Sequence, residues 1–355
     1  MAVCFIAPPD LLAYAIDEGD AAERAAALRA IAASAALRAQ RQVVGALMRT
    51  LDVDVGALRL VPQLEESRRT VYDAEHGGRL ELPGRLVRAE HDPPVADAAV
   101  NEAFDAAGTT YAFYRDVYGR DSIDGAGMEL VSSVHYGVRY ENAFWNGVQM
   151  VYGDGGDQLF VEGAFTRALD VIAHELTHGV TQYTAGLQYS LQPGALNESF
   201  SDVFGVLVKQ YAAGAVADSD EAKWLVGAGA LMPRWGRALR SLKAPGTAWE
   251  GDRQPATMDG YVDLPDDNDP RNDNGGVHVN SGIPNHAFYL AATALGGYAW
   301  ERVGRVWYVT LTDRLGPSAQ FADAAAATVD VARELFGGDV ERAVTDAWTR
   351  VGVLA

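Results

Sequence analysis

The run HELTH at residues 174–178 places the strongest constraint on what this chain folds into. On an α-helix, residues i and i+4 lie about 40° apart around the axis, so the imidazoles of His174 and His178 project from one face. Neutral imidazole suits zinc, and Glu175 is placed to reach a metal-bound water without completing the coordination shell itself. The pattern predicts a helix with a zinc site on one face.

A second motif, NESFSD at residues 197–202, supplies a candidate third ligand. Glu198 follows His178 by 20 residues, and we expect it at the beginning of another helix. A catalytic zinc needs a third protein ligand and an open position, and the Glu198 carboxylate meets the first need. Asp202, one turn further along, is expected to accept a hydrogen bond from a ligand histidine and fix its tautomer; the alternative for Asp202 is a solvated helix face.

The organisation of the chain indicates an α+β fold. Its 355 residues suffice for two packed domains and a smaller segment. Helical spacing predicts one or two helices over about 10–50, short strands interrupted by a helix at 95–117 follow over 71–163, and mostly helices follow from 164. The segment 261–278 is rich in Asp, Asn, Pro and Gly, which predicts irregular structure.

Composition excludes several classes of partner. The chain has 29 Lys and Arg against 48 Asp and Glu, a net charge of −19, which makes nucleic acid and anionic membranes poor partners. The sequence contains no run of about 18 apolar residues, so we predict no membrane span. The N-terminus lacks the basic and apolar regions of a secretory signal. Cys4 is the only cysteine, so no intrachain disulfide forms.

Several sequence blocks, taken together and in order, resemble the thermolysin family of zinc metallopeptidases: ENAFWNGVQMVYGDG, VIAHELTHGVTQYTAGL, GALNESFSDVFG and DNGGVHVNSGIPNHAFYLAA. The likeness covers roughly 70–355, and the short N-terminal segment with its Pro-Pro motif resembles the protealysin-like subgroup. The resemblance implies a two-domain fold with the zinc site in the cleft between the domains. Its parts are a propeptide at 1–67, a β-rich domain at 68–189 that ends with the HExxH helix, and a helical domain at 190–355.

The resemblance also implies roles for further residues. His278 and Tyr189 are expected to stabilise the oxyanion and Asp273 to orient His278, although a structural loop histidine is the ordinary alternative for His278 alone. The substrate backbone is expected to bind Asn142, Ala143 and Arg240. The pocket for the residue after the cut bond is expected to be lined by Val171, Val226 and Leu239, for which ordinary core is the alternative.

The activity implied is that of a zinc-dependent endopeptidase, made as a latent precursor, that cuts proteins or peptides on the amino side of apolar residues. The propeptide is expected to act as an intramolecular inhibitor. The alternatives are a zinc hydrolase of another substrate class and a catalytically silent zinc-binding protein, and the presence of Glu175 and His278 argues against the silent protein. The resemblance implies secretion by a non-classical route, with a cytoplasmic location as the alternative.

The chain departs from the family at its paired calcium site. Of the carboxylates that this site needs, only Asp170 is present, and the other aligned positions carry Lys209, Lys223, Leu225 and Ala228. We therefore predict that the paired Ca²⁺ site is lost and that a lysine ammonium pairs with Asp170 in its place. The Asp-rich loop 263–273 is either a polar turn cluster or a separate Ca²⁺ site.

The N-terminal segment offers two explanations for latency. The thiolate of Cys4 is a good zinc ligand and is expected, on one hypothesis, to cap the metal in the precursor. On the other, the segment that contains the Pro-Pro motif blocks the cleft without touching the metal.

Overall fold

The structure is a computed structural model that describes residues 4–50, 68–218, 224–267 and 269–355. The N-terminal segment forms helices α1 (Pro9–Glu18) and α2 (Ala21–Thr50), as predicted. Pro8 and Pro9 begin α1, where a missing backbone N–H costs nothing because the first N–H groups of a helix have no partner within it. The N-terminal segment therefore consists of the short extended strand at Cys4–Phe5 followed by two helices.

The sheet has six strands in the order β1-β5-β6-β4-β2-β3. Their bounds are β1 Cys4–Phe5, β2 Arg69–Asp73, β3 Arg85–Ala89, β4 Leu130–Val134, β5 Ala143–Trp145 and β6 Met150–Tyr152. The β2–β4 and β4–β6 pairs are parallel, and the others are antiparallel. The N-terminal strand β1 thus covers the edge that β5 otherwise presents.

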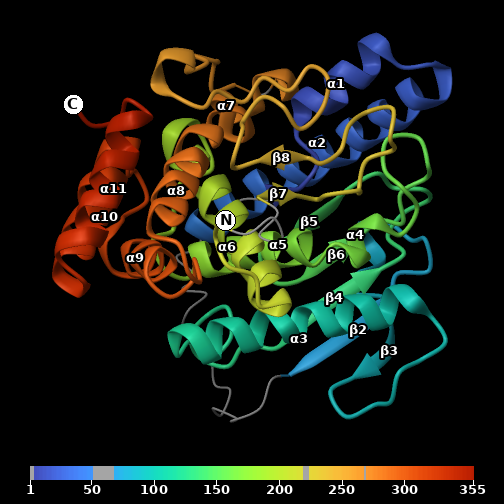
Figure 1. Cartoon of the computed structure of the whole chain (residues 1–355). Coiled ribbons are helices and arrows are strands. Elements are labelled where there is room, and N and C mark those ends of the chain that lie inside the picture. The colour runs from blue at the N-terminus through green and yellow to red at the C-terminus, as the bar shows by residue number, and fades with distance from the viewer. Residues whose placement is uncertain (1–3, 51–67, 219–223, 268) are drawn as a thin grey trace.

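Helix α3 (Ala98–Tyr118) packs against β2, β4 and helix α5, and it is the helix predicted at 95–117. Asp97 caps its first turn by accepting a hydrogen bond from Ala99 N, and Gly119 ends it with φ 71°. One face of the helix is apolar and buried, including Phe104, Ala107 and Tyr114. The helix runs along the sheet and packs against β2 and β4 (Figure 1).

The second half of the chain is helical. It contains α4 (Ala164–Arg167), α5 (Leu169–Gln182), α6 (Leu191–Ala213), α7 (Asp273–Asn280), α8 (Gly282–Leu295), α9 (Val303–Val309), α10 (Phe321–Leu335) and α11 (Gly338–Arg350), with a small hairpin of β7 (Leu225–Val226) and β8 (Arg240–Ser241). A π-turn at Thr310–Arg314 and 3-10 turns at Arg79–Glu81, Met258–Gly260 and Pro270–Asn272 complete the regular structure. No helix among the residues described is long and apolar enough to cross a bilayer.

Helices α5 and α6 lie at the centre, between the sheet and the C-terminal helices, and pack most extensively against each other (Figure 1). Their apolar residues belong to one buried cluster that also contains residues from α3 and α8, such as Val100 and Phe288. The α+β class and the division into a sheet-rich N-terminal part and a helical C-terminal part are confirmed. The predicted zinc ligands His174, His178 and Glu198 lie on this central helix pair.

Two local predictions were wrong. Helix α6 begins at Leu191 rather than beside Glu198, because Pro193 fits a first turn and a Cβ on Gly194 would lie 2.4 Å from Val277 Cγ1, so close packing requires the glycine. Regular structure also begins before residue 278. The left-handed residues end at Gly276 (φ 79°), and a helical turn then carries His278.

Candidate active site

Three buried side chains on α5 and α6 converge on one point. His174 Nε2 lies 3.1 Å from His178 Nε2 and 3.5 Å from Glu198 Oε2, and His178 Nε2 lies 3.4 Å from Glu198 Oε1. Donors about 2.1 Å from a tetrahedral zinc are separated by about 3.4 Å. These spacings match a zinc site, and among the residues described this is the only group of three or more metal-ligating side chains whose donor atoms lie within 4.8 Å of one another.

The two imidazoles are arranged so that a cation fits between them. His178 Nδ1 faces Asn197 Oδ1 at 2.8 Å, and His174 Nδ1 lies 2.8 Å from Asp202 Oδ1, so each Nδ1 carries its proton toward an acceptor. Burial lowers the pKa of His178 to about 3, which keeps the ring neutral. The Nε2 atoms of the two rings face each other, with His174 Nε2 near Glu198 Oε2 and His178 Nε2 near Glu198 Oε1. Two nitrogens and a carboxylate oxygen fit Zn²⁺.

More residues hydrogen-bond the metal-binding side chains and Asp202 than the sequence predicted. Ser201 Oγ lies 3.0 Å from His178 Nδ1, and Asp202 also accepts hydrogen bonds from Arg240 and from Asn285 Nδ2. No role had been predicted for Asn197, Ser201 or Asn285. Asn197 and Ser201 belong to the same NESFSD motif as Glu198. Their spacing along one helix could have predicted that they face the ligand histidines. Asn285 is brought in from a distant helix, α8.

Glu175 projects into the site beside the metal ligands. Its Oε2 accepts a hydrogen bond of 2.9 Å from Trp145 N on β5, while its buried Oε1 has no partner. Burial, and then the charge of Glu198, raise the pKa of Glu175 well above its ordinary value. A carboxylate with raised proton affinity and one unoccupied oxygen is suited to accept and return a proton.

His278 faces the same point from α7. Its Nδ1 donates to Asp273 Oδ1 at 2.6 Å, its Nε2 donates to the Phe5 carbonyl at 2.9 Å, and its Nε2 lies 3.4 Å from the Tyr189 hydroxyl. Tyr189 in turn hydrogen-bonds Glu198. Although burial opposes the charge, Asp273 and Glu198 raise the pKa of His278 to about 9. The ring is therefore a cation that donates from both nitrogens.

The residues predicted to hold a substrate backbone lie along β5 and β8, and all three bond the N-terminal segment. Ile6 N donates to Ala143 O at 3.1 Å, and Ala7 N donates to Asn142 Oδ1 at 3.0 Å. Arg240 Nη1 donates to Ile6 O at 3.2 Å. The residues predicted to line the pocket, Val171, Val226 and Leu239, are fully buried in the main apolar cluster of the molecule, which also includes Ile6.

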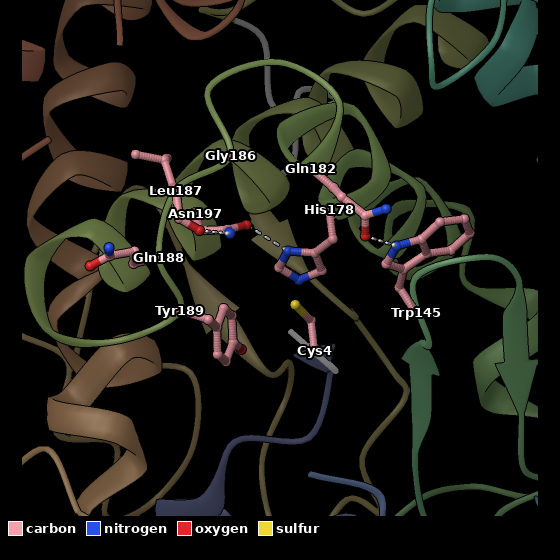
Figure 2. Close-up of a pocket in the computed structure, with 9 residues that line it drawn as sticks. All are labelled: Cys4, Trp145, His178, Gln182, Gly186, Leu187, Gln188, Tyr189 and Asn197. Atoms are coloured by element: carbon pink, nitrogen blue, oxygen red, sulfur yellow. Dashed lines mark hydrogen bonds between the residues drawn. The ribbon is translucent and has the colours of Figure 1, made fainter. Parts of the chain in front are cut away.

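A cavity of about 250 Å³ continues from the end of β1. It is lined by Cys4, Trp145, His178, Gln182, Gly186, Leu187, Gln188, Tyr189 and Asn197. Figure 2 shows the Cys4 sulfur directed toward the His178 ring. The compact group of donor atoms nevertheless consists of His174, His178 and Glu198 and does not include that sulfur.

At the calcium position of the family, the Lys209 ammonium lies 2.5 Å from Asp170 Oδ2 and donates to the Leu225 carbonyl. Gly227 N also donates to Asp170 Oδ2, at 3.0 Å. Lys223 lies outside the described residues. In the loop 263–273, carboxylates are paired locally, with Arg271 on Asp269 and the Asn272 amide on Asp267.

The chain is similar to known metalloproteases over most of its length. The family model described as the catalytic domain of thermolysin metallopeptidase matches residues 59–182, and the model of the alpha-helical domain matches 185–353. An extracellular metalloprotease of Pectobacterium carotovorum subsp. carotovorum is 49% identical over 295 residues, which are 81% of this chain and 82% of that protein. The protease PrtS of Photorhabdus sp. (strain Az29) is 48% identical over 292 residues, 80% of this chain and 76% of that protein.

Among solved structures, the precursor of protealysin, a metalloproteinase from Serratia proteamaculans, superposes with a TM-score of 0.84 at 44% identity and covers 99% of both chains. The matches to both domain models and to relatives over most of their length agree with the metal-binding triad on α5 and α6. The chain therefore belongs to the thermolysin family and is a metalloendopeptidase.

Proposed function

We propose that this metalloendopeptidase is made as a latent precursor and that its mature part cuts proteins on the amino side of apolar residues. The observation that carries the proposal is the buried Glu175 carboxylate, held by Trp145 N, together with the cluster of His174, His178 and Glu198. The same cleft holds the N-terminal segment of the chain. We propose the boundaries 1–67 for the propeptide, 68–189 for the β-rich domain and 190–355 for the helical domain.

We assign the chemistry to the side chains in the cleft. His174, His178 and Glu198 would hold a zinc ion, which would supply a Lewis acid for the substrate carbonyl and for a water molecule. Glu175 takes the proton of that water and returns it to the leaving amine, for which its raised proton affinity suits it. His278, as a cation, and the Tyr189 hydroxyl donate hydrogen bonds to the developing oxyanion. Asp273 orients His278 by a hydrogen bond and stabilises its protonated form.

The proposed specificity rests on the apolar residues expected to line the pocket after the cut bond. Val171, Val226 and Leu239 offer only apolar surface, so a charged side chain there would lose its hydration without gaining a partner. Arg240 is buried and bonded to Asp202, which leaves its Nη1 to bind a substrate carbonyl rather than a carboxylate side chain. This combination favours an apolar residue directly after the cut bond.

We attribute latency to the N-terminal segment as a plug in the cleft. Beyond β1, Tyr14 on α1 packs against the rings of Trp235 and Trp249, with centroids 6.1 and 5.7 Å away. Glu23 at the start of α2 accepts hydrogen bonds of 2.8 Å from Arg234. These contacts hold the segment on the helical part without a metal bond. A Cys4→Ser chain is therefore expected to stay as latent as the wild type, and rapid loss of latency would favour the thiolate cap instead.

We further propose that the paired Ca²⁺ site is absent, since the Lys209 ammonium occupies the position of a cation between Asp170 and the Leu225 carbonyl. The internal pairing of Asp267 and Asp269 supports a polar turn cluster in loop 263–273. Secretion of this chain is proposed by analogy with the relative named as extracellular. Comparing the protein in culture medium and in cells tests the export proposal.

The decisive experiment is to purify the chain, measure bound zinc, remove the N-terminal segment by limited proteolysis, and compare casein hydrolysis by wild type and Glu175→Gln. We expect about one zinc per chain in both and a loss of activity in the variant of about a thousandfold or more. Equal activities would contradict the role of Glu175. Bound zinc without casein cleavage by the wild type would favour a hydrolase of another substrate class or a silent protein.

A further inference from the structure

The N-terminal strand β1 is bound as an extended peptide rather than as an arbitrary plug. Its antiparallel register with β5 pairs Cys4 with Trp145 and Phe5 with Phe144. The next residue, Ile6, is held on both sides, since its N–H donates to Ala143 O and its carbonyl accepts from Arg240. Addition of a peptide strand to an exposed sheet edge is a common way to recognise a substrate backbone independently of its side chains.

The carbonyl of Phe5 occupies the position where an oxyanion would form. It accepts a hydrogen bond of 2.9 Å from His278 Nε2, and this nitrogen lies 3.5 Å from Glu198 Oε2 and 3.4 Å from the Tyr189 hydroxyl. The peptide bond that follows this carbonyl is Phe5–Ile6, so this bond lies where a substrate is cut.

The side chains on either side of that bond also meet substrate-like surroundings. The Phe5 ring packs against Phe144, with centroids 5.4 Å apart. Ile6 is fully buried in the apolar cluster that contains Val171 and Leu239. An apolar residue directly after the bond is what the proposed specificity requires.

We propose that the Phe5–Ile6 bond is itself a substrate and is hydrolysed within the zinc-loaded precursor. The inference rests on the proposed function. The oxygen of water bonds to the Phe5 carbonyl carbon, and Glu175 takes the water proton. The Phe5–Ile6 C–N bond then breaks, and the proton passes to the Ile6 nitrogen. The products are an N-terminal peptide that ends in the Phe5 carboxylate and a chain that begins at Ile6.

The cut does not release the rest of the plug. Ile6 and Ala7 keep their bonds to Arg240 and Asn142, and Tyr14 and Glu23 keep their contacts with the helical part. The precursor that begins at Ile6 is therefore still latent. Full activation needs removal of the remaining N-terminal segment as well.

The first test follows the N-terminus of the full-length, zinc-loaded chain by intact mass and N-terminal sequencing. We expect a species that begins at Ile6, formed with a first-order rate that is the same at widely different protein concentrations because the cut is internal. Glu175→Gln should not form it, Ile6→Leu should, and Ile6→Asp should not. A wild-type chain that keeps its Phe5–Ile6 bond while its casein activity, measured after limited proteolysis, is normal would overturn the inference and leave the proposed function intact. Absence of both activities overturns both.

The second test reads the register without catalysis, by amide hydrogen exchange in zinc-loaded Glu175→Gln. We expect slow exchange at Ile6 and Ala7, whose N–H groups donate to Ala143 O and Asn142 Oδ1. An added Asn142→Ala change should speed hydrogen exchange at Ala7 but leave exchange at Ile6 slow. This result would show that one hydrogen bond is lost while the strand stays bound. Exchange at Ile6 as fast as in an unstructured peptide would overturn the register and with it the proposal.

Discussion

Arg240 Nε donates hydrogen bonds of 3.0 and 2.8 Å to the two carboxylate oxygens of Asp202, deep inside the molecule. Despite its burial, Asp202 keeps a lowered pKa because Arg240 and then His174 favour its charged form. One carboxylate thus joins the guanidinium that we propose to bind substrate to a metal-binding imidazole. A change at Asp202 should affect both metal affinity and folding.

Asp202→Asn should weaken zinc binding by about 10–100-fold, because an amide holds and polarises the His174 ring less well. It should also lower the free energy of unfolding by about 3 kcal/mol, since Arg240 is left as a buried charge without its partner. Chelator competition measures the first effect and chemical denaturation the second. Ser199→Ala, a buried site on the same helix whose hydroxyl has no partner, is the control and should change neither. Unchanged zinc affinity in Asp202→Asn would contradict the assigned role.

His135 should make stability depend on pH. Its Nδ1 lies 2.8 Å from Asp154 and its Nε2 2.8 Å from Asp97, which caps α3. The Asp154 contact and, against the effect of burial, the Asp97 contact raise the pKa of His135 to about 9. Because the folded state binds the proton more tightly, this stabilisation is complete below pH 6.5 and is lost as the pH rises through 9.

We therefore expect His135→Gln to lower stability by about 1–2 kcal/mol at pH 6, after allowance for solvent screening, and by much less at pH 10. Urea denaturation of both proteins across this range measures the difference. The exposed His76, which lies near the same carboxylate, offers a matched control in His76→Gln. A difference between wild type and His135→Gln that stays constant with pH would rule out the titration.

Asp10 should weaken docking of the N-terminal segment at neutral pH. This buried carboxyl lies on α1, and burial followed by the charge of Asp273 raises its pKa to about 6. The docked state therefore holds the proton more tightly, so docking is most favourable below pH 3.8 and becomes less so as the pH rises through about 6. Ionisation of Asp10 costs the docked state about 3 kcal/mol at neutral pH.

Asp10→Asn should consequently tighten latency at pH 7 and slow maturation, since the amide accepts the Leu11 N–H without a charge. The rate at which protease activity appears, compared at pH 5 and pH 7, measures the effect. Asp17→Asn, a change on the same helix, serves as the control and should mature like the wild type. Faster maturation of Asp10→Asn at pH 7 would show that the charge stabilises docking instead.

Lys209 should make the thermal stability of the protein independent of calcium. Its ammonium neutralises Asp170, which is buried, so Lys209→Met should lower the free energy of unfolding by about 3 kcal/mol. With zinc present throughout, the melting temperature of the wild type should be the same in excess Ca²⁺ and in a calcium-selective chelator. A rise of several degrees with Ca²⁺ would contradict the loss of the site.

The sequence by itself determined the chemistry of the centre, because spacing along a single helix is a local property. His174 and His178 share a face through the 3.6-residue repeat, and Asn197, Ser201 and Asp202 project toward them from the motif that holds Glu198. The acidic composition, and the helices near the N-terminus and in the second half of the chain, could likewise be predicted from the sequence alone. The start of α6 was misplaced because a Gln-Pro-Gly segment suggests a turn until its packing against Val277 is known.

Only the tertiary structure decided which distant residues complete the cleft. Asn285 reaches Asp202 from α8, Trp145 N reaches Glu175 from β5, and Phe5 places its carbonyl on His278 across most of the length of the chain. No local spacing encodes these contacts, because they depend on how the sheet and the helices pack around α5 and α6. The N-terminal strand could be expected in the cleft from resemblance, but its register, and so the bond presented to the catalytic side chains, is set by backbone hydrogen bonds that exist only in the folded chain.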